Sequence, residues 1–224
     1  MSQGIGYNVD VVLCIDATGS MGPFIDEVKA NALKLHGDIL AVLEQKDKQV
    51  SEFRVRVVAF RDVRCDDRSI EESPFFVLPD EEGAFASFVN AVIADGGGDA
   101  PESGLHALGV ALASDWTKAG DKRRHIVVMW TDTSTHPVEE GSYPAGVSGD
   151  VAKSLDELTE QWDVGQDSLK LETNARRLVI FAPDDPSWNQ LEAWEQVVHY
   201  TSQAGKGLSD IDYGAILDAI AGSV

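Results

Sequence analysis

Short apolar runs alternate with longer segments of helical periodicity along most of this chain. The runs are rich in Val, Ile and Phe and only a few residues long, as is typical of buried β-strands. They predict strands at 9–15, 53–60, 75–78, 125–130 and 177–182. Helices are predicted where apolar side chains recur every three or four positions, at 24–44, 81–93, 103–114, 152–161, 188–202 and 211–220.

The order of these elements predicts the fold class. Only a polar loop joins the strands 53–60 and 75–78, too short for a helical crossover, so we expect them to pair antiparallel. Elsewhere the alternation of strands and helices favours parallel pairing with right-handed crossovers. The chain is therefore expected to be one α/β domain over residues 1–224, with its core at about 8–220. It would have an open, doubly wound, mostly parallel Rossmann-like sheet with one antiparallel edge strand and helices on both faces.

Charge narrows the classes of function. The formal net charge is −20, from 38 acidic and 18 basic residues among 224. Such a surface repels phosphate groups, so we expect no nucleic-acid partner. No run approaches the length of a membrane span, and the first ten residues lack the pattern of a signal peptide. We expect a cytoplasmic protein with no membrane partner.

Oxygen-bearing side chains follow three predicted elements. Asp16, Thr18 and Ser20 end the first apolar run, and Asp132 directly follows the strand 125–130. A glycine-rich loop with acidic residues, 95–103, precedes another helix. Each loop alone could be a helix cap or a turn. Together they favour a cation site, because ligands bind outside the carboxyl ends of parallel strands and hard cations such as Mg²⁺ select oxygen.

The sequence Asp16-Ala-Thr18-Gly-Ser20-Met, with Asp132 in Trp-Thr-Asp, resembles a von Willebrand factor type A domain. This fold is shared with integrin inserted domains, and the resemblance covers nearly the whole chain. The family's metal-ion-dependent adhesion site begins with Asp-x-Ser-x-Ser and includes an Asp after the fourth strand. The residue pattern of these loops is similar to that of a bacterial branch of the family, or to that of the type A domains associated with alpha-kinases.

The second loop departs from the family pattern. The family usually has a Thr after a Gly pair, whereas here Asp99 follows three glycines. Asp99 is the expected metal residue, and Glu102 and Ser103 remain alternatives. A carboxylate at this position would strengthen cation binding and weaken the attraction for an acidic partner group.

The resemblance implies a binding module and not an enzyme. Thr18 and Ser20 would be direct metal ligands, while Asp16 and Asp132 would act mostly as outer-shell charge. The expected cofactor is Mg²⁺, with Mn²⁺ or Ca²⁺ as substitutes. A carboxylate from a protein partner would complete the coordination.

Three alternatives stay open. The same fold could carry a degenerate metal site and act as a structural scaffold. The segment around Ser20 differs at one residue from the G-x-S-x-G motif of serine hydrolases. In that alternative Ser20 is the nucleophile, His136 or His199 is the base, and Asp132 orients the base. Asp16 could instead form an acyl phosphate, although that pattern needs a second Asp where this chain has Thr18. For His136 a role in bracing its loop is favoured over ligand contact, and residues 64–68 are expected to form a solvated turn.

Overall fold

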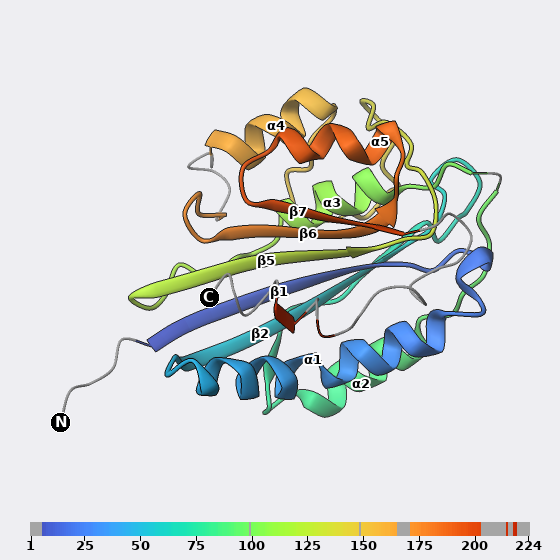
Figure 1. The fold of residues 1–224 in the computed structure, drawn as a ribbon. Helices are drawn as coiled ribbons and strands as arrows, with labels where there is room; N and C mark the ends of the chain where they lie inside the picture. The colour runs from blue at the N-terminus through green and yellow to red at the C-terminus, as the bar shows by residue number, and fades with distance from the viewer. Residues whose placement is uncertain are drawn as a thin grey trace.

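The computed structural model describes residues 6–98, 100–147, 149–164 and 171–202, together with Gly214, Leu217 and Asp218. Within these ranges seven strands form one sheet (Figure 1): β1 (Gly6–Asp16), β2 (Gln49–Phe60), β3 (Ile70–Glu72), β4 (Phe76–Leu78), β5 (Lys122–Trp130), β6 (Arg176–Pro183) and β7 (Val197–Ser202). The helices are α1 (Ile25–Gln45), α2 (Glu82–Ala91), α3 (Gly104–Leu112), α4 (Leu155–Val164) and α5 (Pro186–Asn189), with the 3-10 turns η1 (Gly19–Met21) and η2 (Gln190–Ala193).

The sheet order places the first strand at its centre. The order is β3-β2-β1-β5-β6-β7, and β4 also pairs with β2. Strands β2, β1, β5, β6 and β7 pair in parallel, whereas β3 and β4 both run antiparallel to β2. The mostly parallel α/β fold class is therefore confirmed, and its antiparallel edge consists of two short strands.

Helices cover both faces of the sheet because the buried strands are apolar on both sides. In Figure 1 α1 and α2 lie on one face, and α3, α4 and α5 lie on the other. Val11, Leu13 and Ile15 of β1 face the first layer, while Val12 and Cys14 face the second. All nine residues of α3 are buried, so this helix lies inside the molecule. No helix within the described ranges is long and apolar enough to cross a membrane.

The helix predicted over 188–202 is wrong. The chain there forms the end of α5, the turn η2 and then β7, which pairs in parallel with β6. Trp188, Leu191 and Trp194 are buried at spacings of three, which imitates a helical stripe. The following Val197-Val198-His-Tyr-Thr run is rich in β-branched and aromatic residues, which pack well on a pleated surface.

Two other predictions concern a short strand and the C-terminal segment. Strand β3 lies within the loop expected between the predicted strands 53–60 and 75–78, where it pairs Val58–Phe60 with Ile70–Glu72. The helix predicted at 211–220 falls outside the described residues except for Gly214, Leu217 and Asp218. The extent of the domain over residues 1–224 stays a prediction.

Candidate metal centre

The first and third oxygen-rich loops begin side by side. Ile15 of β1 is paired with Trp130 of β5, and Asp16 is paired with Phe60 of β2, so these strands end at the same edge of the sheet. Strand order reverses at β1 and β5, which is the place where open α/β sheets bind ligands. The topology therefore brings Asp16 and Asp132 to one location.

A chain of hydrogen bonds joins the predicted metal residues of these two loops. The Thr18 hydroxyl donates to Asp16 Oδ1 at 2.6 Å and lies 3.1 Å from Ser20 Oγ. Ser20 Oγ in turn donates to Asp132 Oδ1 at 3.0 Å. The Thr18 N–H also donates to Asp16 Oδ1 at 2.9 Å, which closes a turn at the end of β1. Four of the five residues predicted from the sequence thus form one connected oxygen cluster.

Sequence reasoning missed one member of this cluster. Thr131 donates its hydroxyl to Asp16 Oδ2 at 2.6 Å and is only 1% exposed. Both oxygens of the fully buried Asp16 carboxylate are therefore hydrogen-bonded. The adjacency of Thr131 to Asp132 was the available signal, but a buried Thr after a strand is too common to single out.

The second loop contributes Glu102 to the same location. Asp99 lies outside the described residues, so its position stays a prediction. Ser103 is fully buried, and its Oγ accepts a hydrogen bond from the Val63 N–H at 2.9 Å. Glu102 is 5% exposed and lines one pocket of about 230 Å³ together with Thr18, Ser20 and Asp132.

Backbone contacts hold the three loops together. The Gly19 N–H donates to the Gly96 carbonyl at 3.0 Å, and the Asp95 N–H donates to the Ala17 carbonyl at 3.0 Å. Glu102 forms an isolated parallel bridge with Thr135, which ties the second loop to the third. Gly96 and Gly97 have φ angles of +68° and +76°, which side chains rarely adopt, so this approach requires glycine.

The charged segment 64–68 is more than a solvated turn, because Asp66 belongs to the support of the second loop. Asp66 Oδ2 accepts from the Gly97 N–H at 2.8 Å. Nearby, the Arg61 guanidinium donates to the carbonyls of Asp95 and Ile93, at 3.0 and 2.7 Å, and to that of Arg68 at 3.0 Å. Arg61 therefore connects the loop after β2 to the loop after α2 by hydrogen bonds.

Burial and mutual repulsion disfavour the charged forms of the carboxyl groups in this cluster. Burial raises the pKa of Asp16 to about 6 and also raises the pKa of Asp132. The pKa of Glu102 is raised to about 8, first by burial and then by the negative charges of Asp16, Asp62, Asp66 and Asp132. A divalent cation bound here would offset the free-energy cost of ionising these buried carboxyl groups, because its positive charge would neutralise theirs.

The donor set suits a hard cation. It combines hydroxyl and carboxylate oxygens, which Mg²⁺, Mn²⁺ and Ca²⁺ all accept. Among the described residues no group of three acidic, imidazole or thiol side chains could hold a metal ion alone. A cation bound here would therefore have to use the hydroxyls of Thr18 and Ser20 as well, and such a site stays a prediction. The buried, unpartnered Oε2 of Glu102 supplies an orphaned oxygen at the same pocket.

The surroundings of Ser20 do not resemble a serine hydrolase. A hydrolase serine needs an imidazole within hydrogen-bond reach. In the described part of the chain, the hydroxyl of Ser20 contacts Thr18 and Asp132 instead. His136 is 5% exposed, and its Nε2 lies 3.3 Å from Asp62 Oδ1 in the loop after β2. Its role in bracing its own loop stays a prediction. His199 lies on β7, where its Nδ1 is 2.9 Å from Glu192 Oε1.

A comparison with known protein families identifies the family of this chain. A family model described as von Willebrand factor A domain matches residues 10–135, more than half of the chain. The chain belongs to this family. The matched residues of this von Willebrand factor A domain run from β1 to the loop after β5 and so include all five predicted metal residues.

Individual relatives of this von Willebrand factor A domain are distant. "Alpha-protein kinase vwkA" of Dictyostelium discoideum is 25% identical over 142 residues, which are 62% of this chain and 21% of the kinase. The pilus adhesin SpaC of Lactobacillus rhamnosus GG is similar in structure, with a TM-score of 0.58 and 11% identity, over 98% of this chain and 31% of the adhesin. Proximal thread matrix protein 1 of the mussel byssus matches with a TM-score of 0.53 and 11% identity, over 97% of this chain and 49% of that protein. The structural likenesses show the fold, and this chain spans about a fifth of the kinase.

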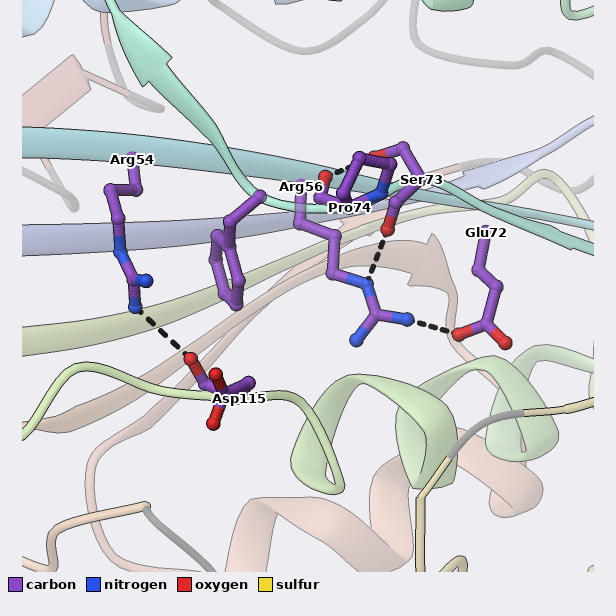
Figure 2. Close-up of a pocket in the computed structure, with 7 residues that line it drawn as sticks. Arg54, Arg56, Glu72, Ser73, Pro74 and Asp115 are labelled. Atoms are coloured by element: carbon purple, nitrogen blue, oxygen red, sulfur yellow. Dashed lines mark hydrogen bonds and ion pairs between the residues drawn. The ribbon is translucent and has the colours of Figure 1, made fainter.

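A larger pocket lies on β2, away from the oxygen cluster. Figure 2 shows its lining, with a volume of about 530 Å³: Arg54, Arg56, Glu72, Ser73, Pro74, Phe75 and Asp115. Arg54 donates to both carboxylate oxygens of Asp10 and to the Asp115 carbonyl. Arg56 donates to the Ser73 carbonyl and forms an ion pair with Glu72. The two guanidinium groups are thus engaged within the chain, and they link β2 to β1, to the segment 72–73 and to the loop at Asp115.

Proposed function

We propose that this von Willebrand factor A domain is a Mg²⁺-dependent protein-binding module and not an enzyme. The observation that carries the proposal is the hydrogen-bonded cluster of Asp16, Thr18, Ser20 and Asp132 at the strand-order switch point. The family is one of interaction domains, and its resemblance implies a metal-ion-dependent adhesion site on these residues. Mn²⁺ or Ca²⁺ would replace Mg²⁺ at some cost in geometry.

The roles follow from the hydrogen-bond pattern. Thr18 and Ser20 would turn their hydroxyl oxygens to the ion, and their protons already point to Asp16 and Asp132 as acceptors. Neutral hydroxyl ligands leave the bound ion electrophilic. It can then accept one further oxygen, which we assign to a carboxylate of a protein partner. When bound, the cation supplies Lewis acidity for this capture.

The test is thermal unfolding with increasing Mg²⁺, at constant ionic strength and with chelator as the zero point. At a free concentration 100 times the Kd, a ligand stabilises by about 2.7 kcal/mol. For a domain of this size that raises Tm by roughly 5–10 °C. Asp16→Ala and Ser20→Ala should remove the rise, and Ser20→Ala should do so with little loss of fold because Ser20 is exposed.

Ser87→Ala is the matched control, since Ser87 is exposed on α2 and outside the pocket. It should keep the full response to Mg²⁺. A wild-type melting curve that does not move across millimolar Mg²⁺, Mn²⁺ or Ca²⁺ would contradict the proposal. That result would favour a scaffold with a degenerate site.

A further inference from the structure

Positively charged side chains gather at the amino ends of the central strands. Tyr7 lies near the start of β1 and is paired with Lys122 at the start of β5. In Figure 1 both strands begin at the left of the sheet. Asp16 ends β1, which at about 3.3 Å per residue places it roughly 30 Å from Tyr7. This surface is therefore separate from the candidate metal centre.

Three cations lie around the ring of Tyr7. The Lys48 Nζ is 5.8 Å from the ring centroid, the Lys122 Nζ is 5.1 Å and the Arg124 Cζ is 5.2 Å from it. Lys122 also donates a hydrogen bond to the Tyr7 hydroxyl at 3.3 Å. This bond lowers the pKa of the phenol against the effect of burial, and the charges of the three cations act in the same direction. The lowered pKa indicates a positive potential at this end of the sheet.

The positive surface continues onto β6. Ile126 of β5 is paired with Arg177 of β6, and Ile126 and Val179 face the layer of α1 and α2. Because side chains alternate along a strand, Arg124 and Arg177 lie on that same face. Burial lowers the pKa of Arg177, and the positive charges of Arg124 and Arg176 lower it further. We call Lys48, Lys122, Arg124 and Arg177 the cationic row.

The described part of the protein leaves two members of the row without an acidic partner. No carboxylate of the described residues forms an ion pair with Lys48 or Lys122. Glu172 carries a negative charge nearby, but it forms its ion pair with Arg123, at 2.6 Å. The whole chain has 38 acidic and only 18 basic side chains, so acidic partners are not scarce in it. Gathering like charges costs free energy, which an anionic ligand would offset.

The form of the row favours an extended acidic segment as this ligand. Neighbouring strands lie about 4.8 Å apart, so the distance from β1 to β6 is roughly 10 Å, the length of about three extended residues. Val198 of β7 is 45% exposed and is paired with Val179, so it lies on the same face and offers an apolar contact. Nucleic acids and anionic membranes extend far beyond the row, where the net charge of −20 repels them.

We propose that the cationic row binds a short acidic segment of a protein partner. The carboxylates of this segment contact the row across the amino ends of β1, β5 and β6, and an apolar neighbour packs against Val198. The inference goes beyond the proposed function, because it needs no metal ion and concerns the other end of the sheet. The domain then has two binding surfaces of different chemistry.

The test measures the binding of acetylated, amidated hexaglutamate to the full chain, by calorimetric titration in metal-free buffer of low ionic strength. The absence of metal ions prevents capture of the peptide carboxylates at the candidate metal centre. The double variant Lys48→Gln with Lys122→Gln should weaken binding about 3–10-fold, because each exposed ion pair contributes modestly. Lys29→Gln with Lys34→Gln is the matched control, since it removes the same charge from α1. It should change the affinity less than about twofold, because distant exposed charges are screened.

Thermal unfolding shows whether the variants are folded, and both should keep a Tm close to that of the wild type. The inference fails if the wild type does not bind hexaglutamate, or if the control loses as much affinity as the row variant. It also fails if inorganic phosphate, a DNA duplex or phosphatidylserine vesicles bind more tightly than hexaglutamate and lose this binding in the row variant. None of these outcomes changes the response of Tm to Mg²⁺, so the proposed function is judged separately.

Discussion

The hydroxyl of Thr131 gives a sharp test of how the oxygen cluster is supported. Thr131→Val keeps the shape of the side chain and removes the 2.6 Å hydrogen bond to Asp16 Oδ2. It also removes a weaker acceptor, at 3.3 Å, for the Thr133 N–H. A hydrogen bond to a charged group contributes about 1.5–3 kcal/mol to stability. Since Asp16 is fully buried, water cannot replace the lost donor, and we expect a loss of about 2–3 kcal/mol at pH 8.

The loss should depend on pH. The pKa of Asp16 is raised to about 6, so at pH 5 the carboxyl group is mostly neutral. A neutral hydrogen bond contributes about 1 kcal/mol, so Thr131→Val should then cost about that amount. Urea unfolding in chelator at both pH values measures the two losses. At pH 8 the Tm should fall by roughly 4–12 °C.

Thr201→Val is the matched control, because Thr201 is exposed on β7 and lies away from the cluster. An exposed substitution of this kind should change stability by less than about 0.5 kcal/mol. The reasoning is refuted if Thr131→Val costs no more than this control at pH 8. It is also refuted if the loss is equal at both pH values.

Three further predictions concern stability away from the cluster. Arg54→Met removes the guanidinium from Asp10, which is 1% exposed, and should lower the urea unfolding free energy by about 3 kcal/mol; an unchanged value would contradict this. Gly37→Ala on α1, where an added Cβ meets nothing within 4 Å, should raise the urea unfolding free energy by about 0.5–1 kcal/mol. A lower Tm in this variant would contradict the prediction. Burial lowers the pKa of His106 to about 4, below that of the unfolded chain, so stability should fall as pH drops from about 6.5 towards 4. That fall should be smaller in His106→Gln, as urea titrations at several pH values would show.

The sequence predicted the elements whose patterns are long and local. The central parallel strands and α1 carry apolar periodicity that only one secondary structure satisfies. Strand β7 was missed because burial along it is irregular, while the buried residues before it, Trp188, Leu191 and Trp194, recur every third position as on a helix. Strand β3 was missed because three residues with two glutamates show no pattern of their own. Its pairing with β2 is a tertiary contact.

The same distinction applies to the candidate site. Asp16, Thr18 and Ser20 could be predicted because they are adjacent in sequence and follow a clear strand. The contribution of Glu102 depends on a bridge to Thr135 and on the space left at Gly97. Neither contact is visible in a single sequence. The role of Asp99 stays a prediction.

Arg61 shows that the glycine-rich loop cannot be treated as an independent sequence module. Its guanidinium bonds to the Asp95 carbonyl from a position 34 residues earlier in the chain. A lysine could not reproduce these contacts, because its ammonium lacks the planar fork that spans several carbonyls. A glycine-rich segment grafted between members of the family would therefore keep its shape only if the recipient also carried this arginine. An exchange of the glycine-rich loop between such domains must therefore transfer the arginine together with the loop.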